Sequence, residues 1–358
     1  MGFAFLGAFF PPPGGDAQAS FIPMAPWLFL LFIPVLMLVV VANLGQLYRW
    51  AAMLTYLALL ALGVGTTLAG IGLSRMPTAA TAALLGEFPG AAGVDWSAVG
   101  IRLVITGLLV LALVLMALRR LPTAAERSWP WQRPIHLTAL VLGVFFAGLN
   151  LAQGVILAEL DLTQGAQNGV LALGLRELLG QAVFFVLLAL LGVGLGIRRN
   201  LSETLARLKV QLPTLRDVGR SLMLTLGLLF ITASLGGLIG LLSPESVTLA
   251  QSFNQVVIEA FAGTAWGVIA LGLLSGVSEE LLYRGAIQPV FGLWATSLLF
   301  ALHHVQYLNL SIVLIIALAL VLGWIRDRYH TTVAMLVHAM YNALIALIAM
   351  GAVRFVSG

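Results

Sequence analysis

Long blocks of apolar residues alternate with short polar segments along most of the chain. The blocks lie near residues 26–46, 51–73, 99–118, 137–158, 178–197, 221–242, 260–278, 292–308, 311–325 and 331–350. Within them apolar residues occupy all sides of a helix rather than one stripe, which is the pattern of helices embedded in lipid. Because a spanning helix needs about 20 apolar residues, the pattern predicts an all-α polytopic membrane bundle of about 8 to 10 transmembrane helices.

The composition points the same way. Of the 358 residues, 61% are apolar and 9% are charged, whereas an average soluble domain is about half apolar and about a quarter charged. This balance excludes an ordinary soluble enzyme, a disordered protein and a nucleic-acid-binding protein. We expect an integral membrane protein in the cell membrane of a prokaryote, with the lipid bilayer as its main partner and no nucleic acid.

The basic residues predict an orientation. If the N-terminus lies outside and each block crosses once, 14 of the 18 Lys and Arg residues fall on the inner side. Such an excess is what the positive-inside rule expects of cytoplasmic loops. The sequence therefore predicts ten crossings with both termini outside, and it places Glu279 at the cytoplasmic side.

Three parts of the chain differ in character. Residues 1–23, which contain three consecutive prolines, are expected to form an irregular arm. Residues 24–220 are expected to be a scaffold of transmembrane helices, with a basic cytoplasmic loop at 198–220. Within that loop, leucines at helical spacing predict a short helix from Leu201 to Leu208. Residues 221–358 are expected to be the chemical core, because four of the five histidines lie in the last 56 residues.

The first candidate site motif is the acidic pair Glu279–Glu280, followed by Arg284. Residues four apart share a helix face, so Glu280 can pair with Arg284. Glu279 points about 100° away and is left without a local partner. The pairing makes Glu280 a structural carboxylate and leaves Glu279 as the reactive one. By contrast, the sequence places Arg326 in a solvated loop.

Two further motifs carry polar residues in apolar surroundings. His303 and His304 follow Phe300, and His338 lies four residues before Asn342, so that the imidazole and the amide share one helix face. Ionisable groups cost at least a few kcal/mol each inside a bilayer unless they are paired. Each motif alone is explained by helix–helix hydrogen bonding, but three of them in one C-terminal stretch indicate a reactive site.

The combination favours activation of a water molecule. A free carboxylate and an imidazole can take a proton from water, and a second imidazole with an amide N–H can donate to a developing oxyanion. We expect no cofactor. A zinc-dependent version remains open, with Glu279, His304 and His338 as ligands. A second alternative is a non-catalytic membrane protein, namely a transporter or an immunity protein that binds a partner.

The ordered set Glu279–Glu280–x–x–x–Arg284, Phe300–x–x–x–His304 and His338–x–x–x–Asn342 resembles the three motifs of the CPBP family. This family contains CAAX-processing endopeptidases and bacteriocin-processing or immunity-associated proteins, and it groups intramembrane glutamic proteases. The resemblance covers roughly residues 259–350. The phenylalanine spacing selects His304 rather than His303 as the histidine of the second motif.

The resemblance implies an α-helical intramembrane endopeptidase with a CPBP-type catalytic core, whose cavity opens toward the cytoplasm. Its substrate would be a membrane-embedded or lipid-modified peptide. The implied roles are water activation by Glu279 and His304, an oxyanion site at His338 and Asn342, and support from Glu280, Arg284 and Phe300.

Overall fold

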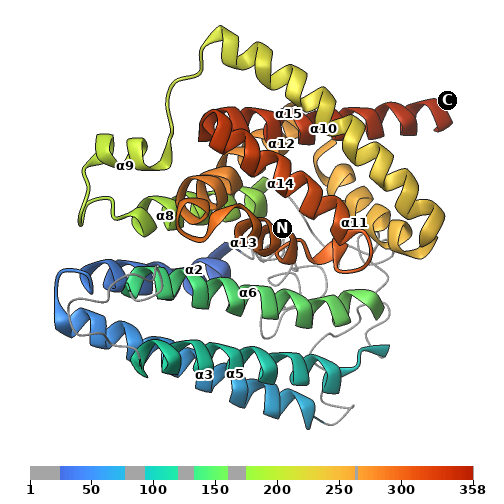
Figure 1. Ribbon diagram of the computed structural model, residues 1–358. Helices are drawn as coiled ribbons and strands as arrows, with labels where there is room; N and C mark the ends of the chain where they lie inside the picture. The colour runs from blue at the N-terminus through green and yellow to red at the C-terminus, as the bar shows by residue number, and fades with distance from the viewer. Residues whose placement is uncertain (1–24, 77–92, 120–132, 160–174, 263–264, 358) are drawn as a thin grey trace.

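The protein is a bundle of α-helices, seen in a computed structural model that describes residues 25–76, 93–119, 133–159, 175–262 and 265–357 (Figure 1). The predicted N-terminal arm at residues 1–23 lies outside the described residues. The helices in chain order are α2 (Ala25–Leu44), α3 (Arg49–Ser74), α5 (Trp96–Arg119), α6 (Pro134–Glu159), α8 (Leu175–Val193), α9 (Leu201–Leu208), α10 (Leu215–Leu242), α11 (Pro244–Ala262), α12 (Ala265–Glu280), η3 (Leu281–Ile287), α13 (Gln288–Leu302), η4 (Val305–Tyr307), α14 (Ile312–Arg328) and α15 (Thr331–Ser357).

Six helical segments within the described ranges are long and apolar enough to cross a membrane. They are Arg49–Ser74, Trp96–Arg119, Pro134–Glu159, Leu215–Leu242, Trp266–Leu302 and Thr331–Ala349. Shorter apolar helices occur at Phe32–Leu44 and Leu178–Val193. The all-α, polytopic membrane fold predicted from the sequence is confirmed, and the protein is an integral membrane protein.

The segment from Trp266 to Leu302 runs to one end of the bundle and returns. Val268 at its start and Val305 just after it belong to one apolar cluster with Val256 of α11. Gly285, between them in sequence, lies beside Leu208 of α9, so close that a Cβ there would be 3.0 Å from the leucine side chain. The break lies at Gly292, where α13 is kinked with a φ of 79° (α12 continues through η3 into the first residues of α13), as the separate blocks at 260–278 and 292–308 predict.

The basic segments gather at one end of the bundle. The predicted helix at 201–208 is present as α9, with a capping box between Asn200 and Glu203 at its start. Thr331, at the start of α15, donates to the carbonyl oxygens of Leu208 (2.5 Å) and Lys209 (3.1 Å). We refer to this as the inner end, since it carries most of the arginines.

The opposite, outer end is formed by α11, η4 and the start of α14. Ser311 donates to the carbonyl oxygen of Ser246 at 3.0 Å, and Asn254 donates to the Tyr307 hydroxyl at 2.8 Å. In Figure 1 α9 lies at the left, and the junction of α10 and α11 lies at the right. Successive apolar helices thus run between two distinct ends.

Two close helix contacts depend on glycine. A Cβ at Gly100 of α5 would lie 2.5 Å from the Gly70 carbonyl oxygen of α3, and a Cβ at Gly276 of α12 would lie 2.6 Å from the backbone nitrogen of Ala339 in α15. Small residues allow backbones to approach within a membrane, where dispersion contacts replace the hydrophobic drive. The contact at Gly276 fixes α12 against α15 within one turn of the acidic pair.

The structure corrects the predicted layout at three points. A helix absent from the prediction, α11, occupies residues 244–262. The block at 292–308 is not one helix, because α13 ends at Leu302 and the two histidines follow its end. Arg326 does not lie in a solvated loop: α14 continues to Arg328, and Arg326 is buried, with a 2.9 Å ion pair to Asp327.

The orientation can be tested because the chain has no cysteine. Thr248 of α11 and Ser202 of α9 are both exposed and lie at opposite ends. In right-side-out vesicles, Thr248→Cys should react with a membrane-impermeant maleimide, and Ser202→Cys should react only after permeabilisation. The measurement is the mass shift of the purified protein. The reverse pattern would show that the basic end faces outward.

Candidate active site

The acidic pair ends α12 where the helix changes its geometry. Glu279 and Glu280 are the last residues of α12, and residues 281–287 continue as the π-helical turn η3. Such wide turns are rare and are frequent at functional sites. Glu280 and Arg284 are fully buried, and Glu279 is 4% exposed. The end of α12 and the turn after it therefore carry three charged side chains into the packed interior.

Glu280 is bonded on both carboxylate oxygens. Arg284 Nε donates to Glu280 Oε2 at 3.0 Å, which is the pair that the four-residue spacing predicts. His338 Nδ1 lies 3.1 Å from Glu280 Oε1. The Arg284 guanidinium carbon lies 4.9 Å from the centre of the Phe300 ring, within the range of a cation–π contact. Glu280 thus links η3 to α15.

Glu279 faces His304 across a wider gap. Glu279 Oε2 is 3.9 Å from His304 Nε2, too far for a direct hydrogen bond. His304 Nδ1 lies 2.8 Å from the carbonyl oxygen of Phe300. Because a carbonyl oxygen only accepts, Nδ1 carries a proton, and in a neutral ring Nε2 then presents a lone pair toward Glu279. Oε2 of the Glu279 carboxylate and Nε2 of His304 are therefore both hydrogen-bond acceptors.

The neighbouring histidine points elsewhere. His303 Nδ1 is hydrogen-bonded to the Tyr283 hydroxyl. Its ring packs edge-on against Phe146 of α6, with ring centres 6.5 Å apart. His304, in contrast, packs against Phe300 with ring centres 4.5 Å apart. The structure therefore brings His304, and not His303, to the acidic pair.

Asn342 is held by a residue that the sequence analysis did not single out. Its side-chain nitrogen donates to Ser275 Oγ at 2.8 Å, and Ser275 in turn donates to the Leu271 carbonyl oxygen at 2.5 Å. Ser275 lies one helical turn before Glu279, and that four-residue spacing is the signal that points to it. The amide keeps a second N–H that this bond does not use.

The arrangement of donors does not fit a metal ion. Among the residues with described placement, no three His, Cys, Asp or Glu side chains are grouped so that they could bind one ion. Of the three residues that a zinc site would use, His338 is bonded to Glu280, and only Glu279 and His304 face each other. We derive no step through a metal.

Arg284→Ala should destabilise the fold strongly, because it leaves the Glu280 carboxylate buried without its cation. Breaking a buried pair by removing one partner typically costs about 3–5 kcal/mol. We expect a loss of about 3 kcal/mol or more in the free energy of unfolding, measured by denaturant titration in detergent. Arg328→Ala is the control because Arg328 is exposed in the same part of the chain. Equal losses in the two variants would contradict a stabilising role for the pair.

Comparison with known proteins supports the motif assignment. Residues 261–344 match the family described as Type II CAAX prenyl endopeptidase Rce1-like. A stretch of 82 residues is 35% identical to "Uncharacterized protein YpbD" of Bacillus subtilis (strain 168), and it covers 22% of this chain and 43% of that protein. The match thus spans less than half the length of this relative. No solved structure is significantly similar to the chain.

The matched segment contains the whole side-chain cluster described above, from Ser275 on α12 to Asn342 on α15. It also lies within the range over which the three motifs resemble the CPBP family. The C-terminal part of this chain, residues 261–344, is similar to the Rce1-like family of type II CAAX prenyl endopeptidases.

Proposed function

We propose that this protein is an intramembrane endopeptidase that hydrolyses a peptide bond with a water molecule activated by Glu279 and His304. One observation carries the proposal: the buried Glu279 carboxylate at the end of α12 and the partly buried His304 imidazole just after α13 face each other, with their nearest atoms 3.9 Å apart. The match of residues 261–344 to a prenyl endopeptidase family supports the same reaction.

The proposed nucleophile is a water bound between Glu279 and His304. Both facing atoms accept hydrogen bonds, and water offers two O–H donors, so one molecule satisfies both. Glu279 takes one proton while the oxygen attacks the scissile carbonyl carbon. His304 holds the other O–H and so orients the attacking lone pair. The carbon–nitrogen bond then breaks, and the departing amine takes the proton from Glu279.

The proposed oxyanion site is formed by His338 and Asn342 on successive turns of α15. His338 Nδ1–H donates to Glu280, so Nε2 donates to an oxyanion only when the ring is protonated on both nitrogens. The negative Glu280 stabilises that form. Asn342 contributes the N–H that Ser275 leaves unused. Donors fixed in this way need little reorganisation when charge develops.

Glu280, Arg284 and Phe300 are positioning residues in this scheme. Glu280 orients the His338 ring, and Arg284 neutralises Glu280. Phe300 contacts both His304 and the Arg284 guanidinium, so it separates the water-activating pair from the buried ion pair. The scheme needs no cofactor, and activity should persist in a chelator such as EDTA.

The proposed substrate is a membrane-embedded or lipid-modified peptide, cut by a site that opens toward the cytoplasm. Glu279 and Glu280 lie at the end of α12 nearest the basic inner end of the bundle, which favours entry from that side. The family that residues 261–344 match is named for prenyl substrates, so a prenylated peptide is the first probe. We place the protein in the plasma membrane of a prokaryote.

Glu279→Gln and His304→Ala should each lower kcat for a farnesylated CAAX-type peptide by about 10²–10⁴, the range of general acid–base catalysis. The matched controls are Glu245→Gln, an exposed carboxylate on α11, and His303→Ala, the adjacent ring. The measurement is peptide cleavage by the purified protein, with melting temperature recorded for each variant. Full cleavage by Glu279→Gln would rule out the glutamic mechanism. Loss of wild-type cleavage in EDTA with return in zinc would favour the metal-dependent alternative.

Asn342→Ala should lower kcat by about 10²–10³ with little change in KM, as expected for the loss of one oxyanion donor. Ser275→Ala should give a smaller loss, because the amide is still present but less firmly held. Asn254→Ala is the control, since this amide bonds Tyr307 at the outer end. A loss of binding at unchanged kcat in Asn342→Ala would instead assign the amide to substrate binding.

If the protein is instead a non-catalytic transporter or immunity protein, a different result is expected. Under that reading, Glu279→Gln fully rescues the phenotype of cells that lack the protein. The peptidase proposal requires that rescue fails although the variant is folded and present in the membrane.

A further inference from the structure

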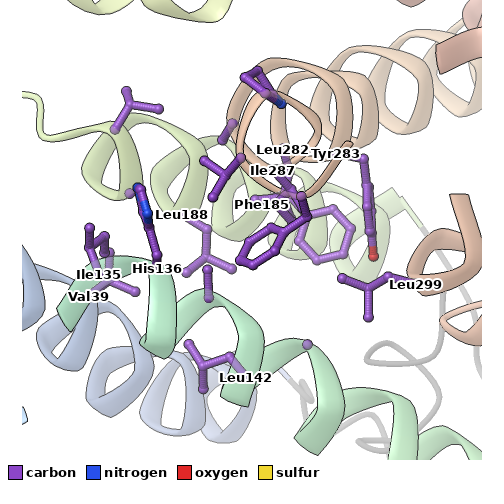
Figure 2. Close-up of a pocket in the computed structure, with 18 of the residues that line it drawn as sticks. Val39, Ile135, His136, Leu142, Phe185, Leu188, Leu282, Tyr283, Ile287 and Leu299 are labelled. Carbon is purple, nitrogen blue, oxygen red and sulfur yellow. The ribbon is translucent and has the colours of Figure 1, made fainter. Parts of the chain in front are cut away.

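A cavity of about 450 Å³ lies at the inner end, beside the candidate active site but separate from it. It is bounded by α2, α6, α8, η3 and α13, and Figure 2 shows mainly apolar side chains around it, among them Leu142, Phe185 and Leu188. Its size falls in the range of pockets that enclose small ligands. Glu279, His304 and His338 are not among its lining residues.

Tyr283 and His303 form part of one side of the cavity. They are joined by a hydrogen bond, so this side carries a polar pair without an acidic group. Figure 2 shows the Tyr283 ring at the side of the cavity near Leu299. The lining includes His303 but neither His304 nor the acidic pair, so the cavity and the candidate active site lie on different sides of this segment.

Four arginines line the cavity: Arg133, Arg198, Arg199 and Arg207. No aspartate or glutamate is among the lining residues, and in the described part of the chain none of the four arginines forms an ion pair. Burial, together with the charges of Arg199, Arg133 and Arg207, lowers the pKa of Arg198. The structure thus concentrates positive charge without a matching acid.

Neutral acceptors hold three of these arginines in place. Arg198 Nε donates to the Asn43 side-chain oxygen at 2.9 Å, and Arg207 donates to the Gly285 carbonyl oxygen at 3.1 Å. Arg199 donates to the Val193 carbonyl oxygen. Asn43 is fully buried and also donates to the Leu191 carbonyl oxygen at 2.7 Å. Side chains fixed in this way keep their full charge available for an anion.

We propose that this cavity binds an anionic amphiphile from the inner leaflet, with one apolar chain between α6, α8 and η3 and a phosphate or carboxylate headgroup at the arginines. Guanidinium groups suit both headgroups because they donate in a planar fork. A small soluble anion would leave the apolar walls unused, and a neutral lipid would leave the arginines uncompensated. The inner surface of a membrane is rich in anionic lipid. The site is independent of the peptidase proposal.

Binding can be measured by native mass spectrometry of the full-length protein in detergent. The probes are oleoyl lysophosphatidic acid, oleate, oleoyl lysophosphatidylcholine and glycerol 3-phosphate. We expect lysophosphatidic acid to bind at least tenfold more tightly than lysophosphatidylcholine and glycerol 3-phosphate. Equal binding of oleate would assign the site to any anionic headgroup, whereas weak binding of oleate would select phosphate.

The variant R198Q/R207Q should weaken lysophosphatidic acid binding about tenfold or more. Its control is K209Q/R216Q, which removes the same charge from exposed residues at the same end that do not line the cavity. Gly192→Leu tests the apolar part with all arginines present: Gly192 lines the cavity, and a Cβ there meets no atom within 4 Å. It should weaken binding without loss of melting temperature.

Three results would overturn the proposal. The first is equal affinity for lysophosphatidylcholine and lysophosphatidic acid. The second is an equal effect of R198Q/R207Q and K209Q/R216Q, which would indicate attraction to the basic surface alone. The third is unchanged binding in a folded Gly192→Leu variant, which also decides the case if R198Q/R207Q does not fold.

Discussion

The buried carboxylate of Glu280 is the group on which the candidate site depends. A charge at membrane depth is costly unless it is paired, and Glu280 is satisfied by Arg284 on one oxygen and by His338 on the other. These two contacts join η3 to α15. They are possible because α12 and α15 approach closely at Gly276, where a side chain would strike the backbone of Ala339. The polar cluster and the glycine contact therefore require each other.

Much of the C-terminal region could be predicted from spacing alone. Glu280 and Arg284 pair because a four-residue step places them on one side of the chain, and the same step predicts that His338 and Asn342 share a face of α15. The apolar blocks predicted most helices because lipid-embedded segments must be apolar on all sides. The helix α11 was not predicted, because Glu, Gln, Ser and Asn interrupt its apolar residues.

The partners across helices could not be predicted, because spacing along one helix says nothing about its neighbours. The sequence places His338 and Asn342 on one helix face, but it gives no sign that His338 is bonded to Glu280 and Asn342 to Ser275. The end of α13 at Leu302 also could not be predicted from the sequence, because His303 and His304 are compatible with a continuing helix. Only tertiary packing separates these two rings, with one turned toward Tyr283 and the other toward Glu279.

The π-helical turn at residues 281–287 has a consequence for chain length. A π turn contains one residue more than an α turn, and each residue of an α-helix turns the chain by about 100°. One extra residue in a regular helix would turn the residues before it by about 100° relative to those after it, whereas a π turn takes up the extra residue locally. The segment can therefore contain one residue more than a regular helix and still present the acidic pair to α15. Arg284 lies inside this turn, so its ion pair with Glu280 depends on the local width of the helix as well as on the four-residue spacing.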